Sequence, residues 1–129
     1  MRVLIADDSA VIVQRLASML AELDGIDVVG HAGSVADAIR AIRTLRPDAV
    51  ILDMQMPGGS GIDVLESPKR DRVTPIVIVL TNYPYPQYRK TCLRKGARFF
   101  MDKSSQFDEV GAVLRRLMGD GSNGVGGEP

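Results

Sequence analysis

Short apolar runs recur five times along this chain, and each is followed by a segment with helical spacing. The runs lie at residues 3–6, at 28–29 with their neighbours, and at 49–52, 75–80 and 99–101. A short, continuous apolar run is typical of a strand that is buried on both faces of a sheet. Strands that alternate with helices predict a parallel sheet, because each return to the sheet needs a crossover. We therefore expect an α/β fold with a doubly wound five-stranded parallel sheet, strand order 2-1-3-4-5, and helices on both faces.

The helical segments carry their own start and stop signals. Ser9 and Ser34 are expected to cap the first two helices, because each precedes an apolar stripe with helical spacing. A short third helix is expected from about Gly61, a polar fourth helix after Pro84 and Pro86 that runs to about Lys95, and a last helix whose apolar face starts at Phe107.

Length and composition indicate one domain and exclude several classes of function. The chain has 129 residues, so we expect a single domain over residues 1–118, followed at 119–129 by a disordered glycine-rich tail or the start of a linker. The formal net charge is zero, which gives no basic excess for direct binding of nucleic acid. The longest strongly apolar run is much shorter than the ~20 residues of a membrane-spanning helix. We expect a cytoplasmic protein that does not enter a membrane.

The single cysteine and single histidine exclude a disulfide and a metal site built from these residues. Polar side chains instead follow the apolar runs, and the carboxyl ends of parallel strands meet at one edge of the sheet. These side chains are Asp7 and Asp8, Asp53, Thr81, Asp102 and Lys103. We expect Asp7, Asp8 and Asp53 to converge, with Thr81 and Lys103 along one side.

Charge favours a particular chemistry for this convergence. Three carboxylates and one ammonium group leave a formal charge of about −2, which a Mg²⁺ ion would bring to about zero. Carboxylates, a backbone carbonyl and water are ligands that Mg²⁺ accepts. A carboxylate beside such an ion and an ammonium group is placed to attack a phosphoryl group and to form an aspartyl phosphate.

These residues resemble the receiver domain of two-component response regulators, in particular the small single-domain type. The resemblance covers residues 1 to about 118 and rests on Asp7-Asp8, on Asp53 in the segment Leu52-Asp53-Met54-Gln55-Met56-Pro57-Gly58, on Thr81, and on Lys103 in Phe99-Phe100-Met101-Asp102-Lys103-Ser104. It implies a flavodoxin-like fold and a phosphorelay switch, not an enzyme that acts on other molecules. The chain would catalyse only its own phosphorylation and dephosphorylation.

The resemblance also implies a role for each residue. Asp53 would accept a phosphoryl group from the phosphohistidine of a histidine kinase, or from a phosphotransfer protein. Asp8 would bind Mg²⁺ directly and Asp7 mostly through water, and Asp53 and the backbone carbonyl of Gln55 would be further ligands.

The remaining roles that the resemblance implies concern the switch and its output. Lys103 would contact the phosphoryl group, Thr81 would donate a hydrogen bond to it, and Phe100 would be the aromatic switch residue. A downstream protein would bind the face formed by the fourth helix, the fifth strand and the fifth helix.

Three features depart from the family pattern. Asn82 follows Thr81 where a small residue is common, and the segment Tyr83-Pro84-Tyr85-Pro86 stiffens the loop before the fourth helix. Ser104 follows Lys103 where proline is usual, often after a cis peptide, so the geometry of the Lys103–Ser104 bond is left open.

Two other functions remain as alternatives. An Asp-nucleophile, magnesium-dependent phosphatase of the haloacid-dehalogenase type would need an acidic residue two positions after the nucleophile, where this chain has Gln55. A degenerate receiver that acts as a constitutive binding module is disfavoured because all five site residues are present. The sequence does not name the kinase, the signal or the downstream partner.

Overall fold

The computed structural model describes residues 1–67 and 74–119. Among these residues, β1, β2, β3, β6 and β7 form one parallel sheet, in the order β2-β1-β3-β6-β7. Their bounds are Arg2–Ala6 (β1), Asp27–Ala32 (β2), Ala49–Leu52 (β3), Ile76–Thr81 (β6) and Phe99–Asp102 (β7). This confirms the predicted α/β fold and the strand order 2-1-3-4-5.

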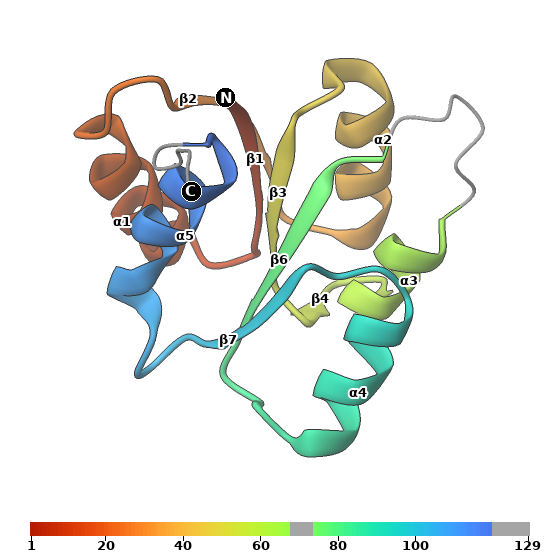
Figure 1. The fold of residues 1–129 in the computed structure, drawn as a ribbon. Helices are drawn as coiled ribbons and strands as arrows, with labels where there is room; N and C mark the ends of the chain where they lie inside the picture. Colours follow the sequence, from red (N-terminus) through yellow and green to blue (C-terminus); the bar gives the residue numbers. More distant parts are fainter. Residues whose placement is uncertain (68–73, 120–129) are drawn as a thin grey trace.

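Helices cover both faces of the sheet (Figure 1). The helices are α1 (Ala10–Ala21), α2 (Val35–Leu45), α3 (Gly61–Glu66), α4 (Pro86–Arg94) and α5 (Val110–Leu117). Figure 1 shows α1 and α5 on one side of the sheet and α2, α3 and α4 on the other. No helix within the described part of the chain has both the length and the apolar character needed to cross a membrane.

The strands separate the described apolar side chains into two clusters, because successive strand residues point to opposite faces. Leu4, Val50 and Val79 belong to the cluster beneath α2, α3 and α4, together with Phe100. The neighbouring residues Ile5, Ile51 and Leu80 belong to the cluster beneath α1 and α5, with Leu114 of α5.

The predicted helix starts are confirmed at the first two helices. The side chain of Ser9 accepts a hydrogen bond from the backbone N–H of Ile12, and Ser34 accepts one from Asp37 in the same way. α4 ends at Arg94, close to the predicted Lys95.

The structure corrects the expected element boundaries in three places. Thr81 and Asp102 are the last residues of β6 and β7, whereas we expected both just after the strands. A two-stranded hairpin, β4 (Gln55–Met56) with β5 (Gly59–Ser60), lies between β3 and α3, where no strand was predicted. Phe107 starts a 3₁₀ turn, η1 (Phe107–Glu109), before α5 begins. The segment 68–73, with Pro68, and the expected tail beyond Gly119 lie outside the described residues.

Candidate functional site

The carboxylates of the site come from the ends of the two central strands, β1 and β3. The backbone N–H of Asp7 donates to the carbonyl of Ala32 at 2.9 Å, and that of Asp53 donates to the carbonyl of Ala6 at 2.9 Å. The pairing of the sheet therefore extends one residue beyond each strand. It fixes the backbone that carries each carboxylate.

Asp7, Asp8 and Asp53 converge as the sequence predicted. Each offers a carboxylate oxygen, and these three oxygens all lie within 4.8 Å of one another. Asp7 and Asp53 are buried, with 5% and 7% of their surface exposed, whereas Asp8 is exposed. Burial raises the pKa of Asp53; Lys103 opposes this rise, and the negative charge of Asp7 adds to it.

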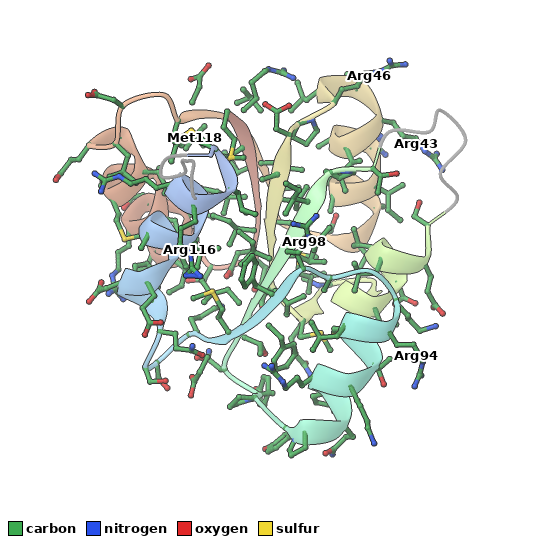
Figure 2. The ribbon with its side chains drawn as sticks, in the orientation of Figure 1. Arg43, Arg46, Arg94, Arg98, Arg116 and Met118 are labelled. Atoms are coloured by element: carbon green, nitrogen blue, oxygen red, sulfur yellow. The ribbon has the colours of Figure 1, made fainter. Side chains whose placement is uncertain are left out.

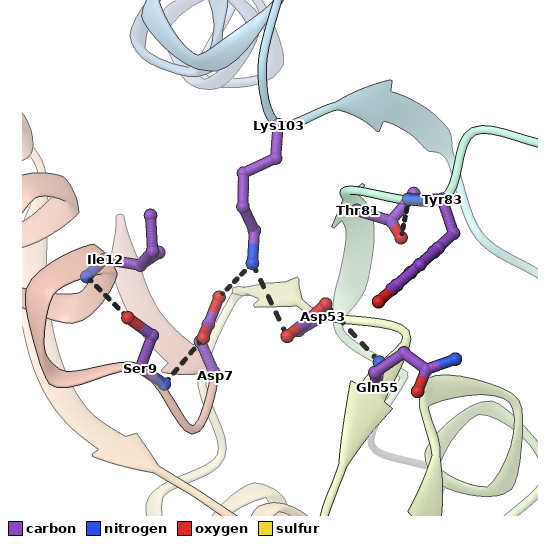
Figure 3. A network of polar contacts seen from close by, with 8 residues as sticks. All are labelled: Asp7, Ser9, Ile12, Asp53, Gln55, Thr81, Tyr83 and Lys103. Atoms are coloured by element: carbon purple, nitrogen blue, oxygen red, sulfur yellow. Dashed lines mark hydrogen bonds and ion pairs between the residues drawn. The ribbon is translucent and has the colours of Figure 1, made fainter.

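Lys103 reaches into this cluster from the segment after β7 (Figure 3). Its Nζ lies 2.7 Å from Oδ2 of Asp7 and 3.4 Å from Oδ2 of Asp53, and the residue is only 8% exposed. A buried ammonium group is costly without a partner, so its two carboxylate neighbours stabilise it in this position. One cation therefore joins the two buried acids.

The turn after β7 holds Lys103 in place through Asp102. One carboxylate oxygen of Asp102 accepts hydrogen bonds from the backbone N–H of Ser104 at 2.9 Å and from its hydroxyl at 2.7 Å. These hydrogen bonds hold the pKa of Asp102 below its usual range. The Lys103–Ser104 peptide is trans. Asp102 thus organises the turn that carries Lys103.

Gly61 permits a close approach beside Asp53 that the sequence analysis did not identify. Its backbone N–H donates to the carbonyl of Met54 at 2.8 Å. A Cβ at this position would lie 2.7 Å from the backbone carbonyl oxygen of Asp53, too close for any other residue without a shift of the backbone. The one sign of this close approach in the sequence was the position of Gly61 directly after the turn Pro57-Gly58-Gly59-Ser60.

Thr81 lies at the end of β6, on the side of the site toward α4. Its Oγ1 accepts a hydrogen bond from the backbone N–H of Tyr83 at 2.9 Å, and Thr81 itself is fully buried. In Figure 3 the Tyr83 ring points from its loop toward the side of the site where Asp53 and Gln55 lie. From the sequence, Tyr83 was predicted only to be part of a stiff loop, and the orientation of its ring was not predicted.

Phe100 and Gln55 complete the predicted site residues. Phe100 is buried on β7 in the same cluster as Val79, its partner in the strand pairing with β6. The backbone N–H of Gln55 lies 3.4 Å from Oδ1 of Asp53, which it approaches as a donor. Thr81 follows Val79 by two residues, so Thr81 and Phe100 lie on the same face of the sheet.

The donor set fits a hard divalent cation. Three carboxylates and one ammonium group leave a net negative charge in a largely buried position, and carboxylate oxygen is the ligand type that such a cation prefers. The acidic cluster of Asp7, Asp8 and Asp53 could therefore hold a metal ion.

Comparison with known proteins gives the family. Residues 3–115 match the model of the response regulator receiver domain. The chain belongs to this family. The receiver domain of NarL from Mycobacterium tuberculosis has the same fold, with a TM-score of 0.81 and 28% identity, over 92% of this chain and 96% of that one.

Longer regulators and a complex are among the other matches. The transcriptional regulatory protein YvfU of Bacillus subtilis is 30% identical over 117 residues, which are 91% of this chain and 58% of YvfU. This chain thus spans little more than half of that relative. A chain in the crystal structure of the CheX-CheY-BeF3-Mg²⁺ complex from Borrelia burgdorferi has a TM-score of 0.82 and 27% identity, over 92% of this chain and 89% of that one.

Proposed function

We propose that this receiver domain is a phosphorylation-dependent switch whose phosphoacceptor is Asp53. The observation that carries the proposal is the contact of Lys103 with both Asp7 and Asp53 inside the acidic cluster. A cation that touches the attacking carboxylate offsets the repulsion between this anion and an anionic phosphoryl group. The phosphodonor would be the phosphohistidine of a histidine kinase or of a phosphotransfer protein.

The reaction transfers the phosphoryl group from nitrogen to oxygen. A carboxylate oxygen of Asp53 forms a bond to phosphorus while the bond from phosphorus to the imidazole nitrogen breaks. The electron pair of that bond stays on the imidazole. Lys103 orients Asp53 before the transfer and faces the added oxygens after it.

The metal proposed for this site is Mg²⁺, held by the carboxylates of Asp7, Asp8 and Asp53 and by the backbone carbonyl of Gln55. When bound, it would neutralise negative charge on the phosphoryl oxygens. The exposed Asp8 would be a direct ligand, and Asp7, which already pairs with Lys103, would act mostly through water.

The switch would use Thr81 and Phe100. Oγ1 of Thr81 already accepts a hydrogen bond from Tyr83, and its own hydroxyl hydrogen is the donor that would serve a phosphoryl oxygen. Movement of Thr81 toward the phosphoryl group would open space on the face of the sheet that Phe100 shares. The result is a shift between two existing surface states of α4, β7 and α5, where a downstream protein would bind.

The first test is phosphorylation by acetyl phosphate with Mg²⁺, followed by intact mass spectrometry. One added phosphoryl group is expected in the native chain, and none in Asp53→Asn. Asp37→Asn is the matched control, because Asp37 is an exposed carboxylate on α2 and should leave the adduct unchanged. An adduct that survives in Asp53→Asn would assign the acceptor elsewhere, and continuous turnover of a phosphomonoester would favour the phosphatase alternative.

The proposed metal ligands are tested by comparing two substitutions. Asp8→Asn should abolish Mg²⁺-dependent phosphorylation, since loss of a direct ligand costs more than loss of a water-mediated contact. Asp7→Asn should retain part of it. A greater loss in Asp7→Asn, measured as the rate of adduct formation against Mg²⁺ concentration, would reverse the proposed order of the ligands.

The coupling is tested with Thr81→Ala. This variant should accept the phosphoryl group but lose the effect of phosphorylation on partner binding. Thr44→Ala, an exposed threonine on α2, is the matched control. Unchanged phosphate dependence in Thr81→Ala would remove Thr81 from the mechanism.

A further inference from the structure

Three tyrosines form a row that runs from the loop after β6 into the first turn of α4. The ring centroids of Tyr83 and Tyr85 are 6.3 Å apart, and those of Tyr85 and Tyr88 are 5.6 Å apart. Tyr83 is 41% exposed and Tyr85 is 49% exposed, while Tyr88 is partly buried against the core. Adjacent exposed aromatic rings are typical of surfaces that bind another protein.

The segment that carries these rings is strongly basic. Residues 82–101 contain five lysines and arginines and no aspartate or glutamate. Lys95 pairs with Glu66 at 2.5 Å, and Arg89 donates to the carbonyl of Phe100 at 3.3 Å. Lys90 and Arg94 have no carboxylate partner within the described residues. Two exposed cations of α4 are thus available to a ligand.

The outer face of α4 combines these charges with apolar contact area. Pro86, Lys90 and Leu93 follow one another at helical spacing and line a shallow groove. Leu93 is exposed at 36%, and among the described residues it belongs to neither apolar cluster of the core. Figure 2 shows Arg94 directed away from the body of the molecule at the end of this helix.

We propose that the tyrosine–basic surface, composed of Tyr83, Tyr85, Tyr88, Lys90, Leu93 and Arg94, docks an acidic segment of a partner protein. Charge complementarity favours an acidic partner, because Lys90 and Arg94 have no carboxylate partner among the described residues and residues 82–101 contain no aspartate or glutamate. Carboxylates of the segment would pair with Lys90 and Arg94, and its aliphatic side chains would pack on the tyrosines and Leu93.

A nucleic acid fits the same surface less well. The formal net charge of the chain is zero, and the three carboxylates of the site lie at the neighbouring strand ends, near the loop that carries Tyr83. A phosphate backbone that continued past α4 in that direction would meet these negative charges. A short acidic segment can end before it reaches them.

Control of this docking by phosphorylation rests on the proposed function. The hydrogen bond from the N–H of Tyr83 to Thr81 Oγ1 joins the first ring of the row to the residue that would contact the phosphoryl group. A shift of Thr81 would therefore move the backbone of Tyr83, and the contacts between the neighbouring tyrosine rings would pass this movement to Tyr88 in α4. Docking itself does not require phosphorylation, so the two proposals can fail separately.

The test is a selection of short peptides from a random-sequence display library against the full chain. It is run with and without beryllium fluoride and Mg²⁺, since beryllium fluoride has the shape and charge of a phosphoryl group. Affinities of the selected peptides are then measured by fluorescence anisotropy on native protein, Lys90→Glu, Arg94→Glu and Tyr85→Ser. Arg43→Glu on α2 and Val11→Ser on α1 are matched controls, because both residues are exposed. Circular dichroism checks that each variant is folded.

The expected result is a set of peptides rich in aspartate and glutamate, each weakened about tenfold or more by Lys90→Glu, Arg94→Glu or Tyr85→Ser and unchanged by the two controls. Neutral or basic peptides, or equal weakening by Arg43→Glu, would overturn the proposal. Tighter binding of single-stranded DNA or of anionic phosphatidylglycerol vesicles at the same residues would replace the protein segment with that ligand. Acidic peptides that bind equally with and without beryllium fluoride would support the docking surface and count against the Thr81 coupling alone.

Discussion

The two helices that flank the edge strand β7 are attached to the molecule in different ways. α5 has four buried residues, Val110, Gly111, Val113 and Leu114, and three of their side chains belong to the apolar cluster on that face of the sheet. In α4, all of which the structure describes, Cys92 is the one buried residue, and Tyr88 adds a partly buried ring. Two polar contacts add to these: Arg89 donates to the carbonyl of Phe100 in β7, and Lys95, directly after α4, pairs with Glu66 of α3.

This difference indicates which of the two helices can leave its place beside β7 at a low cost in free energy. Helix stability in proteins comes mainly from burial of an apolar face, and α4 has little of it. An element held by few buried contacts opens at a lower free energy than the rest of the fold. We therefore expect α5 to behave as part of the core and α4 to open locally.

The largest effect is expected from truncation of a buried leucine in α5. Leu114→Ala should lower the free energy of unfolding by about 2–5 kcal/mol, because Leu114 is fully buried and its loss leaves a cavity. Leu93→Ala in α4 should change it by less than about 0.5 kcal/mol, since Leu93 is partly exposed. Urea unfolding measures both. Similar losses in the two variants would remove the contrast between the helices.

The thiol of Cys92 measures the opening of α4 directly. Its Sγ lies 3.3 Å from Sδ of Met54, and burial raises the pKa of the thiol, so the folded protein should be nearly unreactive. Labelling should therefore proceed through local opening of α4, at a free energy below that of global unfolding. Thiol labelling rates compared with amide exchange of the sheet check this. Labelling as slow as exchange of the sheet core would show that α4 opens only when the whole domain unfolds.

A smaller effect is expected where Arg89 holds α4 to the edge of the sheet. Arg89→Met removes the hydrogen bond to the Phe100 carbonyl and should cost about 0.5–1.5 kcal/mol, with faster amide exchange in α4 than in α5. Lys90→Met is the matched control and should change the free energy of unfolding by less than about 0.5 kcal/mol. Equal effects of the two substitutions would mean that the Arg89 contact does not anchor the helix.

The smallest effect on the free energy of unfolding is expected at the ion pair between Lys95, directly after α4, and Glu66 of α3. Glu66→Gln should cost about 0.2–1 kcal/mol at low salt and less at high salt, because the side chains of Lys95 and Glu66 are 30% and 49% exposed. Unfolding measured at two ionic strengths tests this. A loss that salt leaves unchanged would indicate a role of Glu66 other than this pair.

Much of the fold could be predicted from the sequence because the strands are short, continuous apolar runs between helical stripes. The same pattern placed Asp7, Asp8, Asp53 and Lys103 at one edge of the sheet, and their convergence is confirmed. This works because the carboxyl ends of parallel strands meet at one edge whatever the details of the loops.

Local geometry was less predictable. The hydrogen bonds that Asp102 accepts from Ser104, in the turn that carries Lys103, could not be predicted, since they depend on side-chain torsions within the turn. The close approach of Gly61 to Asp53 depends on the β4–β5 hairpin. Its strands are too short to show the alternation of apolar and polar residues that predicts a strand. The burial of Cys92 was also greater than the polar sequence of α4 suggested.

The tyrosine row has a consequence for spectroscopy. The chain has three tyrosines and no tryptophan, and the tyrosines all lie at positions 83, 85 and 88. Near-ultraviolet absorbance, circular dichroism and fluorescence above the phenylalanine band therefore come from one short stretch, the loop after β6 and the first turn of α4. The tyrosine signal of the native protein therefore reports on that stretch without any added label. The rest of the molecule contributes almost no absorbance or fluorescence at these wavelengths.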